Sequence, residues 1–178
     1  METEYEAKVL DVNVDEIISK LDVLGAKRVG DKLQKRYVYD FNPKKENSWI
    51  RLRTNGTLTT LAIKEIKDDS IEGIKELEVS VSSFEDTSLL LEKLGYKPRG
   101  YQENRRISYL LDDVEVEIDF WPRIPPYIEV EAKSSEKVEE VIKKLGFEVS
   151  ESTSMNTTKV YKKYGIDISS IESLKFED

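Results

Sequence analysis

The sequence predicts an α+β protein built mostly from antiparallel strands, on three observations. A strand pattern with alternating glutamates occurs three times, at residues 4–8, 76–79 and 129–133. Each copy is followed by an amphipathic stretch that ends in Leu-Gly, at residues 24–25, 94–95 and 145–146. The other strand-like segments are joined by short turns, which favours antiparallel pairing. We expect about eight strands and few helices, in one domain that spans residues 1–178.

The first strand, residues 4–8, places its charged side chains on one face. Side chains alternate between the two faces of a strand, so Glu4, Glu6 and Lys8 point one way and the apolar residues point the other. Apolar residues at helical spacing then predict a helix over residues 14–24, with Asn13 as its N-cap.

The next part of the chain reads as a meander of three strands. They are predicted at residues 35–40, 49–54 and 57–64. In the second of them, Arg51 and Arg53 lie opposite the apolar side chains. The dipeptide Asn55-Gly56 predicts a tight hairpin between the second strand and the third.

The second half repeats these elements. Helices are predicted at residues 84–94 and 136–145, and a hairpin at residues 105–111 and 114–120. Alternation in the hairpin places Arg106, and not Arg105, on the charged face. Residues 159–164 fit either a strand or a helix.

Composition excludes several classes of function. The 178 residues carry 36 acidic and 28 basic side chains, a net charge of −8, which argues against non-specific binding to nucleic acid or to a membrane surface. Cysteine and histidine are both absent, so a metal site must be made of oxygens, which suits Mg²⁺, Mn²⁺ or Ca²⁺. No signal core or membrane-spanning run occurs, and we expect a cytoplasmic protein.

The charged rows allow two interpretations. Alternating charge usually marks the solvated face of an antiparallel sheet. Here, however, three strands carry Glu-x-Glu and one carries Arg-x-Arg, and like charges side by side need a counter-charge or a metal. If the sheet closes with this face inward, the enclosed charges are too costly to desolvate unless they are paired or occupied. A polyphosphate held together with divalent cations satisfies both signs of charge.

In this order along the chain, the charged motifs resemble the CYTH superfamily, the triphosphate tunnel metalloenzymes. The motifs are Glu4-x-Glu6-x-Lys8, Arg51-Leu-Arg53, Lys64, Glu76-x-Glu78, Arg106, Asp119 and Glu129-x-Glu131. The resemblance covers roughly residues 2–163 and implies an eight-stranded antiparallel β-barrel, a triphosphate tunnel, with flanking helices. One departure is Asn104, which stands where several adenylyl cyclases of the family have a lysine.

Site residues follow from the same resemblance. The implied metal ligands, for Mg²⁺ or Mn²⁺, are Glu4, Glu6, Asp119, Glu129 and Glu131. The implied phosphate-binding residues are Lys8, Arg51, Arg53, Lys64, Arg106 and, with a weaker match, Lys159. Of these, Lys8, Arg53 and Arg106 are the expected catalytic residues. The resemblance leaves open whether four further glutamates contact metal or only pair with the cations; these are Glu76, Glu78, Glu115 and Glu117.

The resemblance implies a metal-dependent hydrolase of a triphosphate-containing small molecule, such as inorganic triphosphate, ATP or thiamine triphosphate. The alternative in the same fold is an adenylyl cyclase that converts ATP to cyclic AMP and pyrophosphate. A third hypothesis is a module that binds polyphosphate without turnover. The sequence leaves open the substrate, the number of metal ions and the oligomeric state, for which a homodimer is one option.

Overall fold

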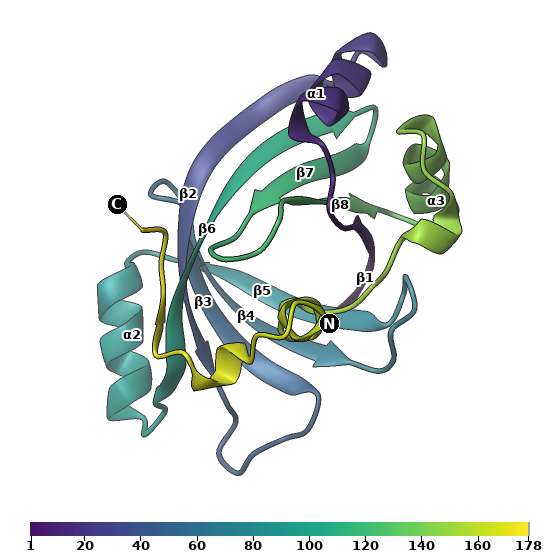
Figure 1. The fold of residues 1–178 in the computed structure, drawn as a ribbon. Helices are drawn as coiled ribbons and strands as arrows, with labels where there is room; N and C mark the ends of the chain where they lie inside the picture. The colour runs from purple at the N-terminus through teal and green to yellow at the C-terminus, as the bar shows by residue number, and fades with distance from the viewer. Residues whose placement is uncertain (178) are drawn as a thin grey trace.

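Eight antiparallel strands close into a barrel in the computed structural model, which describes residues 1–177 (Figure 1). Along the chain they are β1 (Glu2–Val9), β2 (Lys27–Tyr39), β3 (Ser48–Thr54), β4 (Thr59–Ile66), β5 (Ile74–Val81), β6 (Pro98–Leu111), β7 (Val114–Phe120) and β8 (Tyr127–Ala132). Around the barrel the order is β2-β3-β4-β5-β1-β8-β7-β6, and pairing of β2 with β6 closes the ring. The predicted α+β fold with an eight-stranded antiparallel barrel is confirmed. The predicted domain extends to residue 178, which lies outside the described range.

Three of the helices follow the strands that carry the repeated glutamate pattern. Helix α1 (Val14–Val23) follows β1, α2 (Phe84–Lys93) follows β5 and α3 (Ser135–Lys144) follows β8. Their N-termini are capped by the side chains of Asn13, Ser83 and Ser134. Each helix ends at Leu-Gly, where the glycine takes a positive φ that other residues rarely adopt. Within residues 1–177, no helix is both long enough and apolar enough to cross a membrane.

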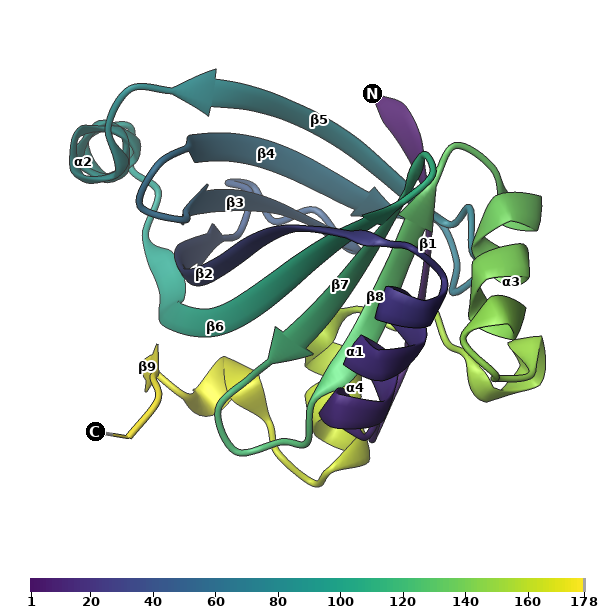
Figure 2. The same cartoon turned by 90° about the horizontal axis from the view of Figure 1, so that it is seen from above.

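The helices cover the outside of the barrel (Figure 2), and the apolar cores lie beneath them. Leu21 of α1 and Ile142 of α3 belong to one core together with Val116 and Val130 of the barrel wall. Helix α2 packs Leu91 in a second core on the outer face of β2 and β3. Because alternate strand residues face opposite sides of the wall, these apolar contacts turn the charged rows toward the inside.

Strands β2 and β6 are longer than the sequence predicted. They begin at Lys27 and Pro98, not at residues 35 and 105, and they pair from Lys27 with Leu110 to Tyr39 with Pro98. The register shifts twice along β2, between Arg28 and Gly30 and again near its end. A bulge interrupts the two-residue period, so the first part of β2 shows no alternation in its sequence.

The turn between β3 and β4 also differs from the prediction. It contains four residues, 55–58, and its ends are joined by a hydrogen bond from Asn55 N to Leu58 O of 3.1 Å. The side chain of Asn55 accepts hydrogen bonds from the backbone N–H groups of Thr57 and Leu58. An asparagine that bonds to the backbone ahead of it stabilises this wider turn in place of a two-residue hairpin.

The segment after α3 returns to the barrel. It contains two short 3₁₀ turns, η1 (Val149–Glu151) and η2 (Ile168–Ser170), with helix α4 (Thr157–Lys163) between them, and β9 (Ser173–Leu174), which runs parallel to β6. Residues 159–164, which the sequence left as a strand or a helix, therefore belong mostly to a helix.

Residues Thr153 and Ser154, here called the C-terminal strap, complete the wall beside β1. Strand β1 pairs with β5 from Glu2 to Glu4. Further along, Lys8 exchanges two backbone hydrogen bonds with Thr153, of 2.7 and 2.8 Å, and Ser154 Oγ donates to Glu6 O at 2.9 Å. The strap thus holds the half of β1 that carries Glu6 and Lys8.

Candidate functional site

The barrel encloses a cavity of about 780 Å³ that is lined mostly by charged side chains. Inward-facing charges come from all eight strands, as the two-residue alternation requires. Among them are Glu4, Glu6, Lys8, Arg36, Arg51, Arg53, Lys64, Glu76, Glu78, Arg106, Glu115, Glu117, Glu129 and Glu131. The predicted charged rows therefore face one shared space.

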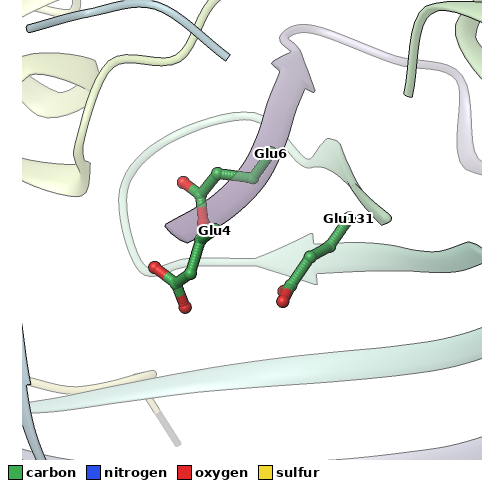
Figure 3. A group of neighbouring side chains, drawn as sticks. All are labelled: Glu4, Glu6 and Glu131. Atoms are coloured by element: carbon green, nitrogen blue, oxygen red, sulfur yellow. The ribbon is translucent and has the colours of Figure 1, made fainter. Parts of the chain in front are cut away.

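Three carboxylates form a cluster on one wall of this cavity. Each of Glu4, Glu6 and Glu131 offers an oxygen that lies within 4.8 Å of the other two (Figure 3). Glu6 and Glu131 are paired residues of the neighbouring strands β1 and β8, which explains why they meet. Oxygen ligands at this spacing suit Mg²⁺ or Mn²⁺.

Burial, together with neighbouring carboxyl groups, raises two pKa values in this cluster. Burial, together with the neighbouring carboxyl group of Glu76, raises the pKa of Glu4 to about 8. Burial, together with the charges of Glu129 and Glu6, raises the pKa of Glu131 to about 7. Both carboxyl groups therefore hold a proton more readily than an exposed glutamate does, and a cation bound between them would favour their ionised forms.

Lys8 and Arg106 form an ion-pair network beside the carboxylate cluster. Lys8 Nζ lies 2.5 Å from Glu6 and 2.9 Å from Glu129, and Arg106 Nη2 lies 3.0 Å from Glu129. Burial alone would raise the pKa of Glu129, but the charges of Lys8 and Arg106 hold it below its usual range. Glu129 is thus ionised and shared between two cations.

A second network lies on strands β3, β4 and β5. Arg51 Nη2 lies 2.7 Å from Glu76 and 2.9 Å from Glu78, and Arg53 lies 3.5 Å from Glu78. Lys64 Nζ bridges Glu76, at 3.0 Å, and Glu4, at 2.8 Å. In this structure Glu76 and Glu78 therefore pair with cations.

The structure places the other predicted residues as follows. Arg106 faces the cavity, whereas Arg105 pairs outside the barrel with Asp31 at 2.8 Å. Asp119 is fully buried behind the lining and accepts two hydrogen bonds from Arg106. Lys159, on α4, borders the cavity and bonds to Asp69 at 2.6 Å.

The candidate metal ligands thus fall into two groups. Glu4, Glu6 and Glu131 come together, while Glu129 and Asp119 bond to Lys8 and Arg106. A metal role for Glu129 and Asp119 stays a prediction.

The sequence analysis did not single out several charged residues that line the cavity, among them Asp40, Arg99 and Arg36. Arg36 of β2 also lines the cavity, and its guanidinium carbon lies 4.2 Å from the centre of the Trp121 ring. The signal was present in the predicted strand 35–40, because alternation sets Arg36 opposite Tyr37 and Tyr39.

Comparisons with known proteins identify the family of this chain. Among solved structures, a protein of Pyrococcus horikoshii OT3 shares 26% sequence identity, with a TM-score of 0.75, over 86% of this chain and 96% of that chain. A candidate adenylate cyclase of Vibrio parahaemolyticus shares 11% identity, with a TM-score of 0.77, over 90% and 98% of the two chains.

A third structure, from Hippeastrum, is of a candidate adenylyl cyclase described as having a dominant triphosphatase activity. It shares 18% identity, with a TM-score of 0.61, over 92% of this chain and 96% of that chain. No curated protein matches the sequence. The protein-family model of the CYTH domain matches residues 2–164. With nearly its whole length matched, the chain belongs to the CYTH family.

Proposed function

We propose that the protein hydrolyses the triphosphate group of a small molecule inside the barrel, with Mg²⁺ or Mn²⁺ as cofactor. One observation carries the proposal: the carboxylate cluster of Glu4, Glu6 and Glu131 lines the same cavity as a set of arginines and lysines. Carboxylates hold divalent cations, whereas guanidinium and ammonium groups bind phosphate oxygens. A metal-bound triphosphate requires both kinds of group in one place.

The carboxylate cluster fits a divalent cation. Its three oxygens lie within 4.8 Å of one another. Burial and neighbouring carboxyl groups raise the pKa values of Glu4 and Glu131, and a bound cation would favour the ionised form of both. When bound, the ion would neutralise charge that develops on the transferred phosphoryl group.

The cations of the cavity would bind and orient the phosphate chain. Arg51, Arg53 and Arg106 present planar forks of N–H donors, which match phosphate oxygens. Their carboxylate partners hold these forks in place before substrate arrives, so little ordering remains to be done on binding.

Lys8 lies next to the carboxylate cluster and would fix the attacking water or the terminal phosphate. Burial alone would lower its pKa, but Glu129 and Glu6 raise it above the usual range, so its ammonium group stays charged and acts as a donor. Water attacks the terminal phosphorus, the bond from that phosphorus to the bridging oxygen breaks, and orthophosphate leaves.

Adenylyl cyclase activity is the alternative within the same fold. The candidate cyclases of Vibrio parahaemolyticus and Hippeastrum are 11% and 18% identical to this chain, a level that supports the fold alone. Asn104 stands at the position of a cyclase lysine, and its Nδ2 donates to Asp119 at 3.1 Å. Hydrolysis is therefore the function that we put first.

Product analysis tests the proposal. Purified protein is incubated with Mg²⁺ or Mn²⁺ and, separately, inorganic triphosphate, ATP or thiamine triphosphate, and products are resolved by anion-exchange chromatography. Metal-dependent release of orthophosphate supports hydrolysis, and the fastest substrate identifies the attached group. Cyclic AMP with pyrophosphate would establish the cyclase instead, and ligand binding without product would establish a binding module.

Two neighbouring arginines supply matched variants. Arg106→Gln removes a cation from the cavity, whereas Arg105→Gln removes one from the outer surface of the same strand. Loss of turnover in the first variant and not in the second would locate the reaction in the barrel. Equal activity in both variants would exclude that location.

A further inference from the structure

Arg36 differs from the other cations on the barrel wall in having no carboxylate partner among residues 1–177. Lys8, Arg51, Arg53, Lys64 and Arg106 each lie within 4 Å of at least one carboxylate oxygen. Within residues 1–177, the Arg36 side chain instead donates from Nε to Gln102 Oε1 at 3.0 Å and from Nη2 to Thr157 Oγ1 at 3.5 Å. These neutral acceptors orient the guanidinium without offsetting its charge.

The surroundings of Arg36 keep its guanidinium in one orientation. The group stacks over the Trp121 ring at 4.2 Å, an arrangement that favours a cation on the ring face. Across the described part of the chain, Nη1 donates to no protein acceptor, while the residue itself borders the cavity. The Arg36 guanidinium therefore keeps N–H groups available to a ligand of the cavity, in an orientation that its neighbours fix.

Arg36 lies next to a second arginine. Arg36 and Arg53 are directly paired residues of β2 and β3, and both line the cavity. Burial and the charge of Arg51 lower the pKa of Arg36 to about 9, and the charge of Arg51 together with burial lowers that of Arg53 to about 10. Like charges placed together repel, so this arrangement costs stability until an anion offsets it.

The arginine pair and the carboxylate cluster occupy opposite walls of the barrel. In the closed order β2-β3-β4-β5-β1-β8-β7-β6, β1 is four strands from β2 in either direction, and β8 is four strands from β3. Arg36 and Arg53 on β2 and β3 thus face the strands that carry Glu4, Glu6 and Glu131. A ligand that meets both sites must carry negative charge along its length.

We propose that Arg36 and Arg53 form a phosphate subsite that binds the phosphate group farthest from the carboxylate cluster. The inference rests on the proposed function and adds selectivity for chain length to it. A triphosphate spans both walls, whereas a diphosphate held by Lys8 and Arg106, beside the carboxylate cluster, leaves the arginine pair unoccupied.

Metal-free calorimetry tests the subsite without turnover. Sodium triphosphate and sodium diphosphate are titrated into wild-type protein, Arg36→Gln, Arg53→Gln and the surface control Arg105→Gln, in EDTA at one fixed salt concentration. We expect Arg36→Gln to weaken triphosphate binding about tenfold or more, because a charge-assisted contact is lost. Diphosphate affinity should change much less, and the control should match wild type.

Thermal melting of the ligand-free variants separates a binding role from a structural one. If Arg36 serves to bind phosphate, its removal relieves repulsion, and the melting temperature of Arg36→Gln equals or exceeds that of wild type. A lower melting temperature would assign Arg36 to structure and overturn the proposal. Should Arg36→Gln fail to fold, the same titrations on Arg36→Met test the proposal. Methionine is an unbranched side chain of similar length that packs on an aromatic ring, here that of Trp121, without the positive charge.

The outcomes also separate the subsite from the proposed function. Unchanged triphosphate affinity in the Arg36 variant, with turnover intact in wild type, overturns the subsite and leaves hydrolysis standing. Arg36-dependent binding in a wild-type protein that releases no orthophosphate supports the subsite and overturns hydrolysis. Equal loss of diphosphate and triphosphate affinity would exclude selection by chain length.

Discussion

Arg106 and Asp119 form a two-point ion pair across the β6–β7 hairpin, in which they are directly paired residues. Nε donates to Oδ1 at 2.8 Å and Nη2 donates to Oδ2 at 2.6 Å. Asp119 has no exposed surface, and Asn104 also donates to it. The carboxylate therefore fixes the plane of the Arg106 guanidinium from behind the cavity lining.

Asp119→Asn should lower the free energy of unfolding by about 3 kcal/mol, because removal of one partner leaves a buried charge without its counter-charge. Urea denaturation measures this loss. The matched control is Asp31→Asn, which breaks the exposed pair with Arg105 and should cost less than about 1 kcal/mol. Mn²⁺ affinity decides the role of Asp119: a large fall in the variant would indicate a metal ligand, and an unchanged value a positioning residue.

Arg53→Ala should abolish most turnover while the protein stays folded. Arg53 lies in the cavity and has one long ion pair, of 3.5 Å, so its charge is available to a ligand. Loss of a fixed donor at a developing charge costs about 2.7–4 kcal/mol in activation free energy, or roughly 10²–10³ in kcat. Steady-state kinetics measures the turnover, and circular dichroism shows whether the variant is folded. Turnover near the wild-type value would show that Arg53 has no role in the reaction.

Glu6→Gln should also abolish most turnover, for a different reason. The change keeps the shape of the side chain but removes the negative charge that we assign to metal binding. Titration with Mn²⁺ should show weaker binding, and excess Mn²⁺ should restore part of the activity. Glu16→Gln on the exposed face of α1 is the control and should behave as wild type. Normal Mn²⁺ affinity in Glu6→Gln would contradict the assignment.

The affinity for metal should rise with pH between about 4.5 and about 8. Glu4 and Glu131 have pKa values of about 8 and about 7, above the ordinary 4.5, so the folded protein holds extra protons in that window. The free energy of unfolding of the metal-free protein therefore falls as pH rises through it. Glu76, with a pKa of about 2, contributes stability that is lost only below pH 4.5.

Calorimetry with Mn²⁺ in buffers of different ionisation enthalpy checks this prediction, because binding must release protons below pH 8. Glu4→Gln should abolish the rise in Mn²⁺ affinity that the wild-type protein shows above pH 7. A Mn²⁺ affinity that does not change from pH 5 to pH 8 would exclude these carboxylates as ligands.

The parts of the fold that local sequence controls were predictable. The Glu-x-Glu strands, the helix caps at Asn13 and Ser83 and the Leu-Gly helix ends all depend on neighbouring residues, and the structure contains them. The long pairing of β2 with β6 was not predictable, because its bulges remove the alternation and its partner lies far away in sequence. Arg36 was missed because a lone arginine on a strand shows neither its stacking on Trp121 nor its lack of a carboxylate.

The C-terminal strap has a consequence for the order in which the protein folds during synthesis. All eight barrel strands are complete by residue 132. Yet the backbone N–H and C=O groups of Lys8 bond to Thr153, and the C=O group of Glu6 accepts a hydrogen bond from Ser154 Oγ. A nascent chain that has closed its barrel already holds β1 between β5 and β8. It lacks the further hydrogen bonds at Glu6 and Lys8, however, until residues 153–154 have left the ribosome.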